Sequence, residues 1–133
     1  MTLYLLDTNI VSDLVRNPEG AVAAHLKSLA GDTICTSIIV AAELRFGVEK
    51  RGSVRLAAQL ETILADIEII PFEPPADRDY AAVRVQLERA GTPISGNDML
   101  IAAHTLALDA ILVTGNVGEF ERVEGLRVEN WLR

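Results

Sequence analysis

Three features that would each suggest a particular class of protein are missing. Cys35 is the only cysteine among 133 residues, so the chain cannot form an internal disulfide, and a reducing, cytoplasmic setting is expected. The longest apolar stretch, residues 99–113, is too short to span a bilayer and contains His104, Thr105 and Asp109. No basic segment precedes the short apolar run near the N-terminus, so neither a membrane span nor a secretory signal is expected.

An excess of positive charge is also missing. The formal net charge is −7, which excludes a simple nucleic-acid coat because such proteins need a basic surface. An acidic protein can still act on a polyanion if bound cations supply local positive charge. The charge therefore leaves two classes open: a metal-dependent enzyme, or a protein that has no function with nucleic acid.

Half of the residues are hydrophobic and no repeat is visible, which indicates one domain over residues 1–133 with a substantial core. Strands are predicted at 3–6, 33–37, 67–72, 110–115 and 126–131. Helices are predicted at 8–16, 21–30, 37–51, 54–67, 77–91 and 97–108. Thr8 or Asn9 is expected to cap the first helix, Ser37 lies near the cap of the third, and Gly91 closes the fifth. The alternation predicts an α/β three-layer sandwich with a central, mostly parallel sheet.

Polar side chains stand where ligands bind in such a sheet, at the carboxyl ends of the strands. Asp7 ends the first strand, and Thr114 and Asn116 follow the fourth. Glu43 and Asp98 lie on early turns of helices that can cover the same edge. Carboxylates that meet there would repel one another and take up protons unless a cation joined them. Hard oxygen donors suit Mg²⁺ or Mn²⁺.

Each of these residues also has a purely structural explanation. Asp7 can cap the helix that follows it. Glu43 can pair with Arg45 or Lys50, and Asp98 fits the first turn of a helix, where the dipole favours an acid. Asn116 fits a turn. Only the combination of these residues favours a metal site.

Zinc ligands are scarce in the sequence. His104 lies on an apolar helix and is expected in the core, whereas His25 is expected at the surface. Together with Cys35, these residues are too few and too scattered for a zinc site.

Four segments resemble the PIN-domain family and, within it, the VapC-type toxins of bacterial toxin–antitoxin pairs. The segments are LLDTNIVSDL, TSIIVAAELRFGV, GTPISGNDMLIAAHTLAL and ILVTGNVGEFERVEGLRVENW. They occur in the family's order and span nearly the whole chain. The resemblance implies a PIN-like fold and a metal-dependent endoribonuclease that uses Mg²⁺ or Mn²⁺.

The resemblance also implies roles for individual residues. Asp7, Glu43 and Asp98 match the first three acids of the family's site and would bind the metal. Asn116 falls where many members carry a fourth acid, which leaves one or two bound ions open. Glu119 is a nearby substitute for that acid.

Further residues follow from the same resemblance. Thr8 and Thr114 match hydroxyls that orient the carboxylates. Arg16 and Arg45 are close enough in sequence to the acids to contact RNA phosphates, although solvated surface charge explains them equally well. The implied target is single-stranded or loop RNA of a tRNA or rRNA. Cleavage would leave a 5′-phosphate and a 3′-hydroxyl, and loss of the intact RNA would inhibit translation.

Partners are implied as well. A cognate VapB-type antitoxin would cover the acidic groove with its carboxyl-terminal segment and place a basic side chain near the carboxylates. The apolar faces of residues 37–48 and 54–67 exceed what a small sheet needs. Part of that surface is expected to contact the antitoxin and part to form a homodimer, within a toxin–antitoxin hetero-oligomer.

Three rival functions remain. An aspartate-based phosphoryl-transfer enzyme would carry a second Asp where Asn9 stands. A receiver-like signalling domain would need an acidic pair after the first strand and a Lys after the last one, and the sequence has neither. A catalytically weak PIN-like protein that binds RNA or a partner stays open because of Asn116.

Overall fold

The computed structural model describes residues 2–29 and 32–132. Within these residues, the strands are β1 (Leu3–Leu6), β2 (Thr33–Ser37), β3 (Glu68–Ile70), β4 (Ile111–Val113) and β5 (Arg127–Glu129). The helices are α1 (Thr8–Arg16), α2 (Ala21–Ser28), α3 (Ile38–Arg51), α4 (Val54–Ala65), α5 (Ala76–Ala90), α6 (Gly96–Ala107) and α7 (Val117–Phe120). Strands and helices alternate as the sequence predicts.

The sheet has the strand order β3-β2-β1-β4-β5, and every pairing is parallel. The chain moves outward from β1 to β2 and β3 and then returns to β4 on the other side of β1. β1 and β4 therefore flank the switch point of the topology, where parallel sheets bind ligands. Leu6 pairs with Val113, so Asp7 and Thr114 leave the sheet side by side.

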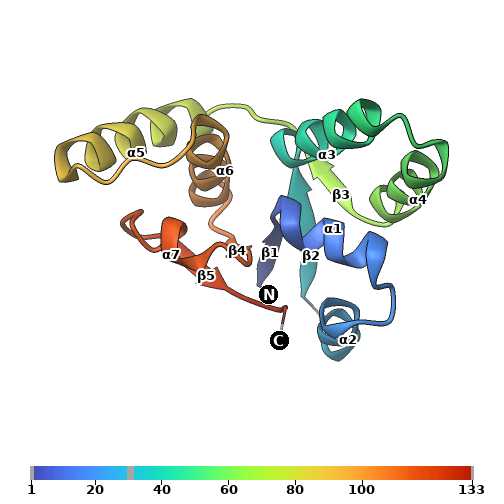
Figure 1. Cartoon of the computed structure of the whole chain (residues 1–133). Coiled ribbons are helices and arrows are strands. Elements are labelled where there is room, and N and C mark those ends of the chain that lie inside the picture. Colours follow the sequence, from blue (N-terminus) through green and yellow to red (C-terminus); the bar gives the residue numbers. More distant parts are fainter. Residues whose placement is uncertain (1, 30–31, 133) are drawn as a thin grey trace.

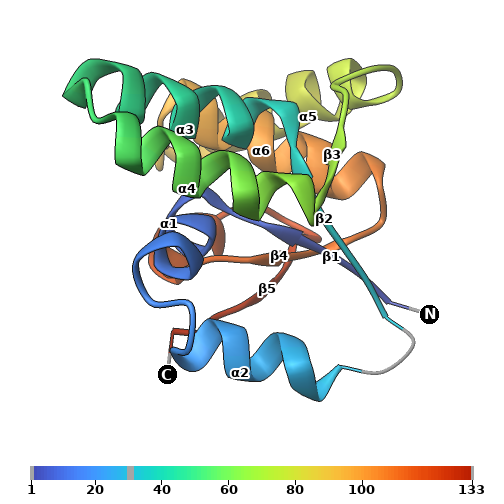
Figure 2. The same ribbon diagram turned by 90° about the vertical axis from the view of Figure 1, so that its right-hand side faces the viewer.

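Helices lie on both sides of this sheet, which confirms the predicted three-layer sandwich. Figure 1 shows α5 and α6 on one side of the strands, and α1, α2 and α4 on the other. In the view of Figure 2, α2 lies below the sheet near the C-terminal end of the chain. None of the helices in the described ranges combines the length and the apolar character that crossing a bilayer requires.

Capping side chains account for several helix boundaries. The Ser37 hydroxyl accepts a backbone N–H at 3.0 Å and caps α3, and Gly91 ends α5 with a φ of 68°, both as predicted. The prediction that Thr8 or Asn9 caps α1 is wrong. Asp7 is the cap residue, and its carboxylate accepts the Thr8 N–H.

Several elements are shorter than the sequence predicts. The helix predicted at 21–30 ends at Ser28, and Ala30 lies outside the described residues. The helix predicted at 54–67 ends at Ala65. Polar and proline residues also shorten the strands predicted at 67–72, 110–115 and 126–131 to three residues each. The short helix α7 was not predicted.

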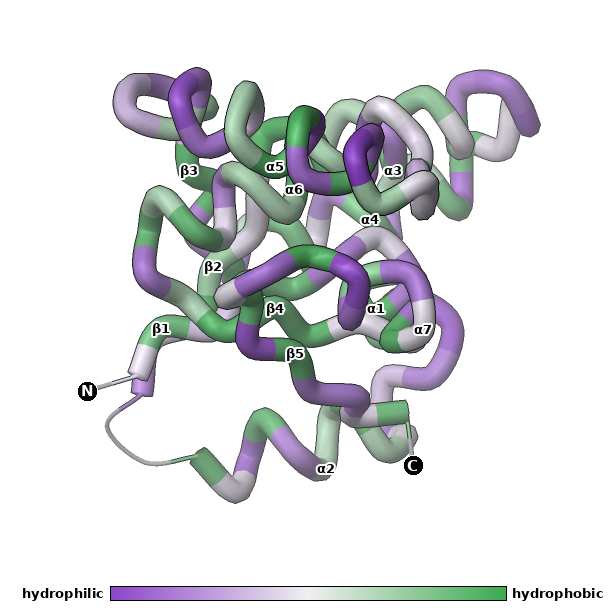
Figure 3. Tube along the Cα trace, turned by 90° about the vertical axis from the view of Figure 1, so that its left-hand side faces the viewer, coloured by the Kyte–Doolittle hydropathy of each residue, from purple (hydrophilic) through white to green (hydrophobic). Residues whose placement is uncertain are grey.

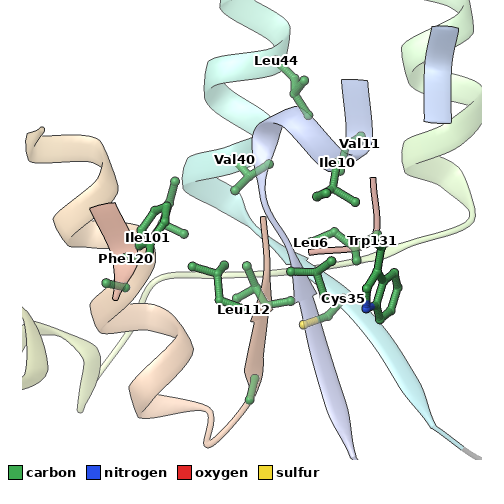
Figure 4. Packing of buried hydrophobic residues seen from close by; sticks show 14 of the residues in the cluster. Leu6, Ile10, Val11, Cys35, Val40, Leu44, Ile101, Leu112, Phe120 and Trp131 are labelled. Atoms are coloured by element: carbon green, nitrogen blue, oxygen red, sulfur yellow. The ribbon is translucent and has the colours of Figure 1, made fainter. Parts of the chain in front are cut away.

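The core lies around the two central strands (Figure 4). Leu5 and Leu6 on β1 are fully buried, as are Leu112 and Val113 on β4. Consecutive apolar residues suit these strands because helices cover both faces of the sheet. The core therefore fixes the ends of β1 and β4, which Asp7 and Thr114 directly follow.

A second part of the core attaches the C-terminal segment to α2. Figure 3 shows hydrophobic and hydrophilic residues alternating along α2, in keeping with a helix of which one face is buried. Trp131 is 1% exposed, and its ring stacks on His25 with centroids 4.1 Å apart. Tyr4 of β1 lies on the same indole, with centroids 5.0 Å apart. His25 is half-buried, so it lies at the surface as expected, with one face of its ring covered by the indole.

Candidate active site

Asp7 is the most buried acid of the candidate site, at 3% exposure. Its backbone N–H donates to the Val113 carbonyl at 2.9 Å and so continues the β1–β4 pairing. Its carboxylate accepts the Thr8 N–H at 2.8 Å and the Thr114 hydroxyl at 2.7 Å. Burial raises the pKa of Asp7, and the charge of Glu43 adds to this, whereas the hydrogen bonds from Thr114 and Thr8 lower it.

Asn9 is a residue of this site to which the sequence analysis gave no role in the proposed metal centre. Its amide nitrogen lies 3.4 Å from an Asp7 carboxylate oxygen and 3.4 Å from the Thr114 hydroxyl. Its carbonyl oxygen accepts the Gly115 N–H at 2.7 Å. A Cβ at position 115 would come within 2.6 Å of the end of the Leu132 side chain and 3.3 Å of the Asn9 carbonyl oxygen, so either side chain would have to shift. Asn9 thus joins the first strand end to the turn after β4.

Glu43 faces Asp7 from α3, as the sequence predicts. The Thr8 hydroxyl donates to its Oε1 at 3.0 Å, across the space between the start of α1 and the middle of α3. Thr8 therefore touches one acid with its hydroxyl and another with its backbone N–H. The alternative in which Glu43 pairs with Arg45 is not what the structure shows, because Arg45 binds Glu61.

Asp98 reaches the same region from the first turn of α6, where Ser95 caps the helix by accepting the Asp98 N–H at 3.2 Å. Burial is the largest cause that raises the pKa of Asp98 to about 6. A hydrogen bond with the Glu119 carboxyl and the negative charges of Asp7 and Glu119 act in the same direction. Asp98 is therefore close enough to Asp7 and to Glu119 for their charges to affect its pKa.

Asn116 is exposed at the start of α7, and its amide donates to Glu119 Oε2 at 3.1 Å. Its backbone N–H donates to the Thr114 hydroxyl at 3.0 Å. Because Glu119 interacts with Asp98, it brings a carboxylate beside the third acid even though position 116 carries an amide.

The donor set fits a hard divalent cation by its chemistry. It consists of carboxylate oxygens, and two of the carboxyl groups have raised pKa values because burial and like charge make their ionised forms costly. A cation would remove that cost. Within residues 2–29 and 32–132, however, no three His, Cys, Asp or Glu side chains already stand close enough to enclose an ion. Asp7 and Glu43 instead accept hydrogen bonds from the hydroxyls of Thr114 and Thr8.

A hollow of about 230 Å³ opens beside Glu43 and Thr8, between α1, α3 and α4. Its floor is largely apolar and includes Leu56 and Leu60. Arg16 and Arg51 lie on its walls, each eight residues along a helix from the site residue of that helix. At 1.5 Å per residue, Arg16 lies about 12 Å along the helix axis from Thr8, and Arg51 lies equally far from Glu43.

Of the two arginines predicted to contact phosphates, only Arg16 lines this hollow. Arg45 lies outside it and pairs with Glu61 of α4 at 2.9 Å. Arg51, which the sequence analysis did not single out, lines the hollow beside Arg16. Helical spacing could have predicted the position of Arg51 beside this hollow, since Arg51 follows Glu43 by just over two turns.

Comparisons with known proteins agree with these features. The family model described as "PIN domain" matches residues 4–126. "Ribonuclease VapC2" of Rickettsia felis is 39% identical over 131 residues, which are 97% of this chain and 98% of that protein. "tRNA(fMet)-specific endonuclease VapC" of Shigella flexneri is 33% identical, over 98% of this chain and 99% of that protein.

Solved structures show the same fold. The crystal structure of VapBC2 from Rickettsia felis, bound to a DNA fragment from the promoter of that pair, contains a chain that superposes with a TM-score of 0.91 at 38% identity, over 98% of this chain and 99% of that one. DNA-bound VapBC from Salmonella typhimurium gives a TM-score of 0.89 at 30% identity, over 98% of this chain and 99% of that one.

Proposed function

The chain belongs to the PIN-domain family, and from this membership we propose that it is a metal-dependent endoribonuclease, the toxin of a VapBC-type toxin–antitoxin pair. The observation that supports the proposal is the place of Asp7 at the carboxyl end of β1, where its charge interacts with Glu43 of α3 and with Asp98 of α6. The named activities of the relatives agree with it, since they are ribonucleases and a tRNA-specific endonuclease.

We propose that Asp7 and Asp98 hold Mg²⁺ or Mn²⁺, with Glu43 binding it directly or through water. The cation would supply positive charge that polarises the scissile phosphodiester. Glu119 restores the count of four acids that Asn116 lowers, which favours this function over a catalytically weak binding protein. Asn9 stands where an aspartate-based phosphoryl-transfer enzyme would need a second Asp, so that alternative gains no support.

The roles of the protein's own groups follow from their positions. Glu43 would accept the proton of the attacking water, while the Thr8 hydroxyl keeps its carboxylate oriented. Thr114 and Asn9 fix the Asp7 carboxylate against the strand ends. Arg16 would bind a phosphate of the same RNA strand within the hollow. The product would carry a 5′-phosphate and a 3′-hydroxyl.

The substrate we propose is an unpaired loop of a structured RNA such as tRNA or rRNA, since splayed strands enter a recessed edge more easily than duplexes. The purified chain should cut a tRNA pool at few sites in Mn²⁺, and EDTA should stop the reaction. Asp7→Asn should abolish cleavage, whereas Asp66→Asn, the same change at an exposed residue after α4, should leave it intact. Equal cleavage by wild type and Asp7→Asn would refute the proposal.

We also propose a VapB-type antitoxin as partner, which would cover the hollow between α1, α3 and α4 and insert a basic side chain toward Glu43. Gly47 supports this location. It lies inside α3, where glycine is unfavourable by about 1 kcal/mol relative to alanine, yet a Cβ there would meet no atom within 4 Å. Because Gly47 has no side chain, it leaves space in the hollow, and a partner can approach the backbone of α3 closely. A homodimer within the complex remains a prediction.

The glycine gives a direct test of this partner. Gly47→Leu should fill the hollow and weaken binding of the antitoxin encoded by the adjacent reading frame by at least about tenfold, because a side chain of that size overpacks a fitted contact. Glu49→Leu adds the same side chain at an exposed position of the same helix and should bind normally. Calorimetry of the purified pair measures both. Unchanged affinity for Gly47→Leu would place the antitoxin elsewhere.

A cytoplasmic location follows from this proposal, since RNA and antitoxin are found there. Cys35 is compatible with it. Burial and the charge of Glu68 raise the pKa of its thiol to about 12, so the group stays protonated and unreactive.

A further inference from the structure

α6 carries a buried histidine that the proposed chemistry does not use. His104 is 2% exposed, as expected for a core residue, and its Nδ1 lies 2.7 Å from the Ser37 hydroxyl. Ser37 is fully buried and separated from His104 by 67 residues of chain. The edge of the Phe72 ring covers the imidazole at a centroid distance of 5.3 Å. The contact therefore joins α6 to the point where β2 becomes α3.

We assign the protons of this pair from the Pro71 carbonyl, which acts on the pKa of His104 as a hydrogen-bond acceptor. Because Nδ1 lies at the Ser37 hydroxyl, the ring N–H that faces this carbonyl is Nε2–H, and the imidazole is neutral. The Ser37 oxygen accepts the Ile39 N–H at 3.0 Å as the cap of α3 and donates its own hydrogen to Nδ1. Burial lowers the pKa of His104 and favours this neutral form. The Pro71 carbonyl acts against that shift, although among the described residues no partner meets Nε2 with full hydrogen-bond geometry.

The two bonded residues occupy equivalent places relative to the acids. Glu43 follows Ser37 by six residues, and Asp98 precedes His104 by six residues. Six helical residues correspond to about 9 Å along each axis. α3 and α6 also pack against each other. The hydrogen bond thus joins α3 and α6, the two helices that carry acids. Ser37 is as far along α3 from Glu43 as His104 is along α6 from Asp98.

We propose that His104 is a positioning residue, which through Ser37 sets the separation of Glu43 and Asp98 and thereby the affinity of the site for a divalent cation. The inference rests on the proposed metal-dependent function and adds a residue to it. A carboxylate displaced by a small shift of its helix coordinates an ion less well, and residues that orient ligands in this indirect way typically contribute tenfold or more to affinity. A histidine that only fills core volume would affect stability and leave metal affinity unchanged.

Two substitutions at position 104 separate these roles. His104→Leu removes the hydrogen bond, whereas His104→Asn places an amide atom near the former Nδ1 and can keep it. Both side chains branch at Cγ and lack the outer part of the ring, so the packing loss is matched. Ser37→Ala deletes the other partner. Ser53→Ala is the control, because Ser53 caps α4 in the same manner but bonds to no histidine.

Mn²⁺ binding to the purified full-length chain, measured by electron paramagnetic resonance of the free ion, gives the readout, and urea unfolding in EDTA gives the stability of the same proteins. We expect His104→Leu and Ser37→Ala to raise the Kd for Mn²⁺ by about tenfold. His104→Asn should recover most of that loss, and Ser53→Ala should bind as wild type does. If His104→Leu does not fold, the Kd of Ser37→Ala for Mn²⁺, compared with that of Ser53→Ala, tests the positioning role.

Two results would overturn the inference, and they differ. In the first, His104→Leu and Ser37→Ala bind Mn²⁺ as tightly as wild type does but are less stable. His104 would then contribute only to core packing, and the proposed function would remain intact. Absence of Mn²⁺ binding by the wild-type chain would remove the proposed metal site and the positioning role with it.

Discussion

Asp98→Asn should stabilise the metal-free protein at neutral pH while destroying its metal site. The pKa of Asp98 is raised from 3.8 to about 6, so the folded state carries an ionised carboxylate at pH 8 at a cost. A difference of about 2 in pKa corresponds to about 3 kcal/mol, and partial exposure of the side chain reduces this to about 1–2 kcal/mol. An amide at this position has no charge to bury and can still bond to Glu119 and Ser95.

The pH dependence fixes the sign of this effect. Below about pH 4 the carboxyl group is protonated in both folded and unfolded chains, so it costs nothing. Between about pH 4 and 6 the folded state binds more protons than the unfolded state, and this contribution to stability falls as pH rises. Above about pH 6 the full cost applies. The advantage of Asp98→Asn over wild type should therefore be small at pH 4 and reach its maximum near pH 7–8.

Urea unfolding in EDTA at several pH values measures this difference, because other titrating groups cancel between the two proteins. Saturating Mn²⁺ should then stabilise wild type, by about 2.7 kcal/mol at a hundred times its Kd, and leave Asp98→Asn unchanged. An advantage of the variant that does not depend on pH, or a variant less stable than wild type at pH 8, would refute the electrostatic reasoning. Equal stabilisation of both by Mn²⁺ would remove Asp98 from the metal site.

Two further predictions concern contacts around the site and the C-terminal segment. Asn9→Ala should lower both Mn²⁺ affinity and RNA cleavage by about tenfold or more, because Asp7 and the Gly115 turn lose their link; unchanged values in a binding titration and a cleavage assay would contradict this. Trp131→Ala should lower the free energy of unfolding by about 3–5 kcal/mol, since it empties a buried site and unstacks His25, and a loss below about 1 kcal/mol in urea unfolding would contradict this.

The position of the site was predictable because it depends on topology. Asp7 directly follows an apolar strand, and parallel strands joined by helices bring their carboxyl ends to one edge. The helix spacing that puts Arg51 on the face of Glu43 was also present in the sequence. The same spacing places Arg45, only two residues after Glu43, on a different face of the helix, which agrees with its absence from the hollow.

The contacts of individual side chains were not predictable. The partnership of Glu119 with Asp98 depends on how closely α7 approaches α6, and no residue pattern encodes that distance. The bridge formed by Asn9 depends on the register of β1 against β4, which brings residues 106 positions apart into contact. The stacking of Trp131 on His25 joins residues 106 positions apart in the sequence, and only the fold brings the C-terminal segment onto α2.

The place of β1 in the middle of the sheet has a consequence for the timing of synthesis. The first acid is translated almost at once, but the backbone and hydroxyl that hold it, Val113 and Thr114, are translated only after more than four-fifths of the chain has been made. A nascent chain that stalls before β4 lacks the strand that orders Asp7. The candidate site is therefore incomplete until synthesis is nearly finished, so the proposed activity would arise only on a nearly complete chain.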